Sequence, residues 1–181
     1  KLFANATKNF LDIFNIISVT SLSAKASLPL SNELFDMVII DEASQCDIAS
    51  AIPLILRAKQ LVVIGDPKQL RHITSLNKTE EERIKEHLHL STSVYLKYKE
   101  KSLWDYSESF LTNAINNNKI VNIDRHYRCH PDIIGYSNEA FYNQKLKICT
   151  KNEDFAIQPN GIKWIDVVGV YKADTININE L

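Results

Sequence analysis

The strongest constraint on the fold is an apolar run at residues 37–40 that stops at two adjacent carboxylates, Asp41 and Glu42. A second apolar run, at residues 61–64, breaks at Gly65 and continues into polar residues. Apolar runs of this length without alternation predict strands that are covered on both faces, as in a parallel α/β sheet. The sequence therefore predicts an α/β fold in which two neighbouring strands each end in polar residues.

The rest of the chain alternates between short apolar runs and helical patterns. Apolar residues at helical spacing predict a helix over about residues 47–58, although Pro53 lies inside it. Residues 77–101 are charge-dense and are interpreted as a helical insertion or connector. The other expected elements are a strand at 16–19 followed by a loop at 20–23, helices at 102–118 and 131–141, and strands at 120–123, 145–150 and 162–168.

The composition sets the limits on the class of protein. A chain of 181 residues is long enough for one well-packed domain or for parts of two. With a formal charge of −1, any contact with nucleic acid must come from a local patch or from backbone groups. Three irregularly spaced cysteines without a signal-peptide pattern favour a reduced, cytoplasmic setting. No apolar stretch approaches the roughly 20 residues that span a bilayer, so no membrane is expected.

The carboxylate pair has a specific chemical interpretation. Phosphoryl transfer needs a metal ligand at the carboxyl end of a strand and a neighbouring group that orients water, and Asp41 and Glu42 match both needs. Taken alone, this pair is also compatible with an exposed strand end, and residues 65–70 with a simple turn. Their occurrence after two successive predicted strands favours the nucleotide-hydrolysing interpretation.

A third cluster of polar residues lies at 126–131. A zinc site could be read into His126, Cys129 and His130. Residues this close together and directly followed by a proline cannot easily form a tetrahedral site, and no CxxC pair accompanies them. Arg128 suits a phosphate better than a lysine does, because its planar fork donates two parallel hydrogen bonds. A mobile cation is the third requirement of phosphoryl transfer.

In this order, the motifs resemble those of the superfamily I helicases, in the branch that includes the nonsense-mediated-decay helicase and its bacterial relatives. The resemblance covers about residues 16–142 and continues more weakly to the end of the chain. The segments that carry it are VTSLSA at 19–24, similar to a motif that contacts single strands, DEASQ at 41–45, similar to motif II, GDPKQL at 65–70, similar to motif III, and YRCHP at 127–131, similar to motif IV.

The resemblance implies a role for each matching residue in the use of ATP and Mg²⁺. Asp41 is expected to coordinate Mg²⁺ and Glu42 to act as the general base. Gln69 is expected to sense the γ-phosphate, with Asp66 supporting it.

Two further groups of residues take their roles from the same resemblance. Tyr127 is expected to stack on the adenine, and Arg128 to reach the γ-phosphate as an arginine finger from a second RecA-like lobe. Thr20 and Ser21 are expected to contact single-stranded nucleic acid. This single strand is expected to be DNA or RNA.

The chain has four glycines and no GxxxxGK[ST] loop, the element whose amides cradle phosphates. We therefore expect a piece of a longer protein that supplies this loop, with residues 1–118 belonging to a first RecA-like lobe and 119–181 beginning a second. On its own the piece is expected to be inactive. Two alternatives stay open: a non-catalytic module for nucleic-acid binding or scaffolding that derives from such a motor, and an ATPase of unrelated purpose that carries a helicase domain.

Overall fold

The structure is a computed structural model that describes residues 9–90, 97–113, 120–155, 165–166, 171–172 and 176–177. It divides into two compact units, Lys1–Val121 and Asn122–Leu181, and each is described by itself. Within the described residues, no helix is long and apolar enough to cross a membrane.

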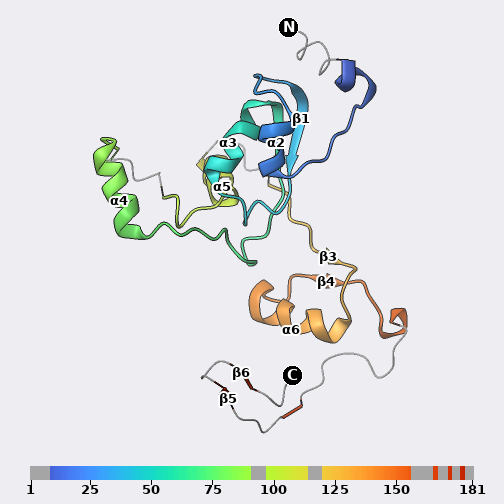
Figure 1. Ribbon diagram of the computed structural model, residues 1–181. Helices are drawn as coiled ribbons and strands as arrows, with labels where there is room; N and C mark the ends of the chain where they lie inside the picture. Colours follow the sequence, from blue (N-terminus) through green and yellow to red (C-terminus); the bar gives the residue numbers. More distant parts are fainter. Residues whose placement is uncertain are drawn as a thin grey trace. The chain divides into compact units, whose positions relative to one another are not determined.

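The first unit is built on two parallel strands, β1 (Phe35–Ile40) and β2 (Ala58–Val63), which are joined by helix α3 (Ile48–Leu56) (Figure 1). Both predicted strands are confirmed, and both begin earlier than the apolar runs. Their register pairs Val38 with Leu61 and Ile40 with Val63. A parallel pair that is connected through a helix is the elementary unit of an α/β fold.

Coverage of both faces of this sheet was predicted, and the described residues do not provide it. Ile40 is 5 % exposed, whereas the alternate residues Met37 and Ile39 are 50 % and 59 % exposed. Side chains along a strand point alternately to opposite faces, and the described elements cover only the face to which Ile40 belongs. The core on that face consists of Ile40, Ala43, Ala51 and Leu103, with Val38, Cys46, Ile48, Leu54, Ile55, Val63 and Trp104 packed against it.

The predicted strand at 16–19 is wrong, and so is the loop after it. Residues 9–13 are helical and residues 16–19 have no regular structure, while helix α2 (Ser21–Ser27) begins where a loop was expected. Thr20 is its N-cap, since its hydroxyl oxygen accepts a hydrogen bond from the Ser23 amide at 3.1 Å. Helix α2 lies beside α3 in Figure 1, and residues of the two helices are in contact.

The charged connector contains the predicted helix. Helix α4 (Lys78–His87) starts with a capping box, in which the Asn77 side chain bonds the Glu80 amide and the Glu80 carboxylate bonds the Asn77 amide. Helix α5 (Leu103–Asn113) follows residues 97–102. The predicted extension of this helix to residue 118 lies outside the described residues.

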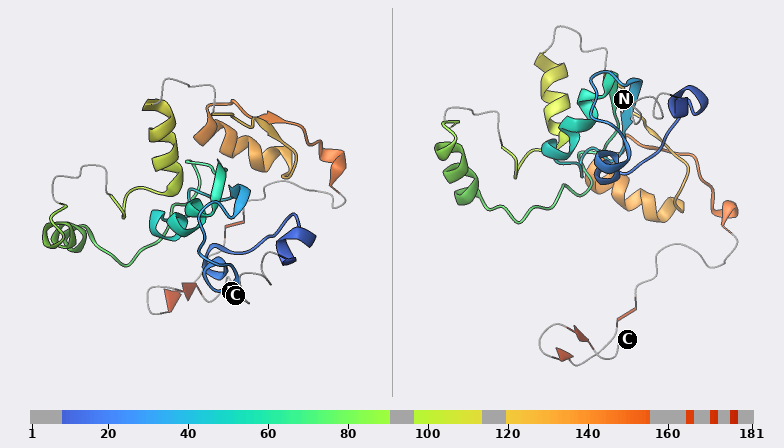
Figure 2. Two further views of the ribbon diagram at one scale, coloured as in Figure 1. Left: turned by 90° about the horizontal axis from the view of Figure 1, so that it is seen from above. Right: turned by 45° about the horizontal axis from the view of Figure 1, so that its top comes forward.

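The second unit contains β3 (Arg125–His126) paired in parallel with β4 (Lys147–Ile148), with α6 (Pro131–Tyr142) between them in the chain (Figure 2). The predicted helix at 131–141 is confirmed, and the strand predicted at 145–150 is shortened to β4. The strand predicted at 120–123 is wrong: these residues have no regular structure, and Val121 and Ile123 are 78 % and 80 % exposed, without the packing that makes apolar residues favour a strand.

The end of the chain is described in parts. A 3₁₀ turn, η2 (Asn152–Asp154), and an antiparallel pair, β5 (Tyr171–Lys172) and β6 (Ile176–Asn177), complete the described elements. Of the strand predicted at 162–168, only residues 165–166 are described, and they are not in a strand.

Candidate nucleotide and nucleic-acid sites

The carboxylates Asp41 and Glu42 lie in a tight turn directly after β1. The Glu42 amide donates to Asp41 Oδ1 at 2.9 Å, and the Gln45 amide donates to the Glu42 carbonyl at 2.9 Å. Glu42 has a φ of 52°, a left-handed conformation that is uncommon for residues other than glycine. Both carboxylates are exposed, so the turn presents two adjacent acidic groups to the solvent at the end of the strand.

The residues behind this turn are anchored by backbone hydrogen bonds. The Ala43 amide donates to the Ile64 carbonyl at 2.9 Å, which extends the β1–β2 ladder beyond both strands. At the start of α5, the amides of Leu103 and Trp104 donate to the carbonyls of Cys46 and Ala43 at 2.8 and 3.2 Å. The turn at residues 41–46 is therefore held from two sides, while its carboxylates remain exposed; the Glu42 carboxylate accepts one hydrogen bond, from Gln45 Nε2 at 3.4 Å.

Gly65 brings the second motif into direct contact with this turn. A Cβ built on Gly65 would come 3.1 Å from the Ser44 amide nitrogen, 3.2 Å from the Ala43 amide nitrogen and 3.1 Å from Trp104 Cε3. Two of these three neighbours are backbone atoms, which cannot move aside as a flexible side chain can. The absence of a side chain at Gly65 thus permits the close approach of the two motifs.

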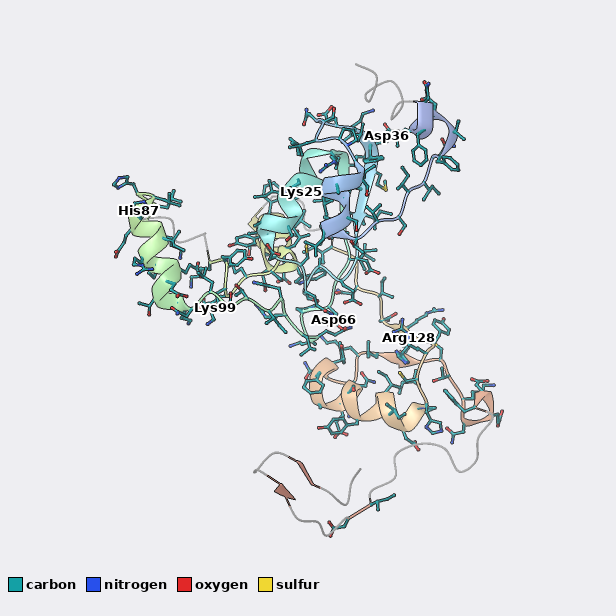
Figure 3. All side chains as sticks on the ribbon, viewed as in Figure 1. Lys25, Asp36, Asp66, His87, Lys99 and Arg128 are labelled. Atoms are coloured by element: carbon teal, nitrogen blue, oxygen red, sulfur yellow. The ribbon has the colours of Figure 1, made fainter. Side chains whose placement is uncertain are left out.

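Asp66 organises the residues that follow. Asp66 Oδ1 accepts from the Lys68 amide at 2.9 Å, and Asp66 Oδ2 accepts from Gln69 Nε2 at 3.1 Å. The label of Asp66 in Figure 3 marks this loop, beyond the end of β2. The predicted contact between Asp66 and Gln69 is present. It holds the side-chain amide of Gln69 with its NH₂ group toward the Asp66 carboxylate.

The residues predicted to contact nucleic acid lie at the start of α2. Thr20 is exposed and caps the helix, while Ser21 forms a hydrogen bond with the side chain of Cys46. Burial raises the pKa of the Cys46 thiol, the Asp47 carboxylate raises it further, and the bond to Ser21 acts in the opposite direction. This bond links the start of α2 to the end of the turn that carries Asp41 and Glu42.

Arg57, which the sequence analysis did not single out, fastens the other end of α2. The residue is 2 % exposed, and its guanidinium donates to four carbonyl oxygens. The acceptors and donor–acceptor distances are Pro53 at 2.6 Å, Pro29 at 2.9 Å, Leu28 at 2.9 Å and Ala24 at 3.4 Å. These carbonyls lie at or just beyond the C-terminal ends of α2 and α3, where the helix dipole favours a cation. A lone arginine between apolar residues gives no sequence signal of such a role.

In the second unit, Tyr127 and Arg128 lie on the short connection between β3 and α6 (Figure 3 labels Arg128). Both side chains are exposed. His126 Nε2 accepts from the Cys129 amide at 2.8 Å, and the buried His130 caps α6 by accepting from the Asp132 amide at 3.2 Å. The two histidines thus shape the backbone on either side of the Tyr127–Arg128 pair.

The donor groups are compatible with Mg²⁺ and do not form a separate metal centre. Among the described residues, no group of three or more His, Cys, Asp or Glu side chains could hold a metal ion. Mg²⁺ is usually bound by one or two carboxylates together with water and substrate phosphates, so the exposed Asp41 and Glu42 meet its requirement. The zinc interpretation of residues 126–130 gains no support, since both histidine rings accept from backbone amides.

Comparison with known proteins places this arrangement in a family. Residues 2–75 match the family model described as an AAA domain. The chain is 32 % identical over 145 residues to Helicase SEN1 of Saccharomyces cerevisiae, in an alignment that covers 79 % of this chain and 6 % of that protein. It is 31 % identical over 132 residues to Probable helicase senataxin of Homo sapiens, covering 69 % of this chain and 5 % of that protein.

A bacterial relative gives the same result. Uncharacterized ATP-dependent helicase MG140 of Mycoplasma genitalium is 28 % identical over 144 residues, covering 77 % of this chain and 12 % of that protein. The chain therefore spans 5 % to 12 % of the length of these three relatives. The parallel α/β architecture, the order of the motifs and these similarities show that the chain belongs to the superfamily I helicases, in the branch of Sen1, senataxin and the nonsense-mediated-decay helicase, with a RecA-like fold.

Proposed function

We propose that the chain is part of a motor that couples ATP hydrolysis to movement along single-stranded DNA or RNA. The observation that carries the proposal is the direct contact of the Asp41–Glu42 turn with the loop of Gln69, enforced at Gly65. Phosphoryl transfer depends on positioning and on charge stabilisation, and a rigid edge that carries acidic and amide groups offers both. The names of the relatives, which include an ATP-dependent helicase, agree with this activity.

In this proposal, Asp41 holds Mg²⁺ and Glu42 accepts the proton of the attacking water. Bound Mg²⁺ would supply neutralisation of phosphate charge. The carboxylates are adjacent and exposed. Glu42 has a left-handed backbone conformation, in a turn whose backbone is hydrogen-bonded to the start of α5 and to the residue after β2. Gln69, oriented by Asp66, senses the γ-phosphate.

Tyr127 and Arg128 serve the same reaction from the second unit. Tyr127 stacks on the adenine, and Arg128 donates to the γ-phosphate as an arginine finger. Their support is that both side chains are exposed on a connection whose backbone two histidine rings hold in place. An arginine there adds a bidentate contact that a lysine cannot reproduce.

Thr20 and Ser21 contact the backbone of the single strand. The bond between Ser21 and Cys46 supports this role, because it connects the start of α2 to the turn that holds the proposed catalytic base. Contacts of this kind bind phosphates and sugars and not base edges, so the motor is expected to show little sequence preference.

We further propose that residues 1–118 belong to the first RecA-like lobe and 119–181 to the second, and that the phosphate-cradling loop lies elsewhere in a longer protein. The isolated chain is then inactive, because Mg·ATP lacks its main anchor. We also propose a reducing cytoplasmic setting, on the ground of the three irregularly spaced cysteines.

The test is the release of phosphate by the full-length protein with and without single-stranded DNA and single-stranded RNA, together with strand displacement from a tailed duplex. We expect hydrolysis that one of the two strands stimulates and that leads to displacement. A full-length protein that binds single strands and hydrolyses no ATP would support the non-catalytic alternative.

A further inference from the structure

An ion pair fastens the segment that follows Gln69 to the start of α5. Arg71 Nη1 and Nη2 donate to Asp105 Oδ2 and Oδ1 at 3.0 and 3.1 Å, and Arg71 Nη1 also donates to the Glu100 carbonyl at 2.6 Å. Two parallel bonds between a guanidinium and a carboxylate fix the direction of the contact as well as its length. The Asp105 side chain is 19 % exposed, so the pair is partly shielded from water.

Asp105 is itself held by the backbone at the start of α5. Its Oδ2 accepts from the Ser102 amide at 2.8 Å and from the Ser102 hydroxyl at 2.7 Å, and the Ser102 hydroxyl oxygen accepts from the Asp105 amide at 3.4 Å. Ser102 is 1 % exposed. These reciprocal bonds resemble a capping box, and they leave the Asp105 carboxylate little freedom.

The same turn of α5 is bonded to the turn that carries the proposed catalytic base. Leu103 and Trp104, the two residues before Asp105, donate their amides to the carbonyls of Cys46 and Ala43. Asp105 therefore follows directly on the residues that hold the turn after Glu42. Its carboxylate meanwhile holds Arg71, which lies two residues after Gln69 in the chain.

A second set of hydrogen bonds connects the same two segments. The His72 ring Nε2 lies 2.8 Å from the Tyr98 carbonyl oxygen, and the Tyr98 hydroxyl bonds the Asp47 carboxylate at the start of α3. Residues 97–105 thus contact the segment after Gln69 and the segment after Glu42 at two separate points. They form a bridge between the two motifs, in addition to the contact at Gly65.

We propose that Arg71 and Asp105 are positioning residues that keep the Gln69 loop and the Glu42 turn in a fixed position relative to each other. A displacement of either motif is then transmitted to the other through α5. The inference rests on the proposed function, in which Gln69 senses the γ-phosphate and Glu42 activates water. Since neither Arg71 nor Asp105 touches nucleotide in that proposal, their loss is expected to affect turnover more than the binding of ATP.

The experiment compares Arg71→Ala, Asp105→Ala, the double variant and Arg71→Lys in the full-length protein, with Lys59→Ala as the control. Lys59 and Asp36 also form an ion pair, at 2.6 Å, but on an exposed part of the same unit. The measurements are strand-stimulated kcat, KM for ATP, and the melting temperature. We expect each alanine variant to lower kcat by about tenfold with KM changed by less than about threefold. The double variant should be no worse than either single one, because the pair acts as a unit.

Arg71→Lys should restore part of kcat, because it keeps the charge and loses the fork. Lys59→Ala should leave all three quantities unchanged. If wild type turns over ATP and both alanine variants keep its kcat, or lose activity only as their melting temperature falls, the inference is overturned while the proposed function stands. If wild type shows no strand-stimulated turnover, the proposed function fails, and this inference fails with it.

Discussion

Gly65 lies directly against Ser44: a Cβ on Gly65 would approach the Ser44 amide nitrogen to 3.1 Å. The segments that follow β1 and β2 thus pack backbone against backbone. The turn that carries Asp41 and Glu42 can lie against the loop that carries Gln69 because Gly65 has no side chain. Substitution of Gly65 by alanine, which adds one methyl group, tests this explanation.

Gly65→Ala should destabilise the protein. Two of the three atoms nearest the new Cβ are backbone nitrogens, so the turn and the loop would have to separate. Overpacking of this kind costs about 1 to 3 kcal/mol, which lowers the urea midpoint of unfolding. The matched control is Gly135→Ala in α6, where a Cβ would meet nothing within 4 Å. There we expect a gain of about 0.5 to 1 kcal/mol, because alanine favours a helix more than glycine does. Equal effects at the two positions would contradict the account.

Arg57→Met should destabilise the first unit more than most substitutions do. Methionine fills a similar volume but donates no hydrogen bond, so four carbonyl oxygens lose the guanidinium as a donor. Those of Ala24 and Pro29 keep a backbone donor, the amides of Leu28 and Ser31. We expect a loss of about 2 to 4 kcal/mol, measured by urea unfolding. Arg57→Lys should fall between, because an ammonium group cannot bond all four carbonyls. A loss no larger than that of Lys59→Ala would show that Arg57 does not hold α2 to α3.

The acid side of the stability profile should depend on Glu81. Burial by itself raises the pKa of this carboxyl, but the ammonium of Lys85 and the amides of Lys99 and Tyr98 outweigh it, so its pKa lies below the ordinary glutamate value of 4.5. A carboxyl whose pKa is lower in the folded state contributes stability at pH values above its unfolded pKa. This contribution is lost as the pH falls from about 4.5 through the folded pKa.

Glu81→Gln should therefore be less stable than wild type at pH 7, and the difference should shrink as the pH is lowered below 4.5. Thermal unfolding at a series of pH values measures this directly. Glu82→Gln is the control, because the Glu82 side chain, which also pairs with Lys85, is 63 % exposed and its ion pair is screened by water. A difference between wild type and Glu81→Gln that does not change with pH would contradict the assignment.

Arg128→Ala in the full-length protein should reduce strand-stimulated kcat drastically and weaken ATP binding much less. Arginine fingers contribute about 10³ to 10⁵ in rate, or roughly 4 to 7 kcal/mol of barrier. Arg128→Lys should rescue little. Arg125, in β3, is the matched control, and Arg125→Ala should be mild. If the two alanine variants were reversed in severity, the alignment of residues 127–131 with motif IV would be wrong.

Much of the first unit could be predicted from sequence because its signals are local. The apolar runs that became β1 and β2 and the helix between them follow from strand and spacing rules. The contact of Asp66 with Gln69 was expected from the resemblance of residues 65–70 to motif III. The strand predicted at 16–19 failed because an apolar run without a partner does not form a ladder, while Thr20 supplied a helix cap three residues before Ser23.

The residues that join distant segments could not be predicted in the same way. Arg57 bonds carbonyls up to 33 positions away, and Arg71 pairs with a carboxylate 34 positions away. Nothing in the local pattern of either arginine specifies such a partner. Asp105 gave a weak signal, the Ser102-x-x-Asp105 spacing of a helix start, but its bond to Arg71 depends on the tertiary fold.

The most direct test of the central claim is Glu42→Gln in the full-length protein. Glutamine keeps the size and the hydrogen-bonding reach of glutamate but cannot accept the proton of the attacking water. Binding of Mg·ATP, measured by equilibrium titration, should stay within about threefold of wild type, while strand-stimulated phosphate release should fall by a factor of about 10² or more. A variant that binds ATP and releases phosphate at the wild-type rate would remove Glu42 from catalysis and contradict the account.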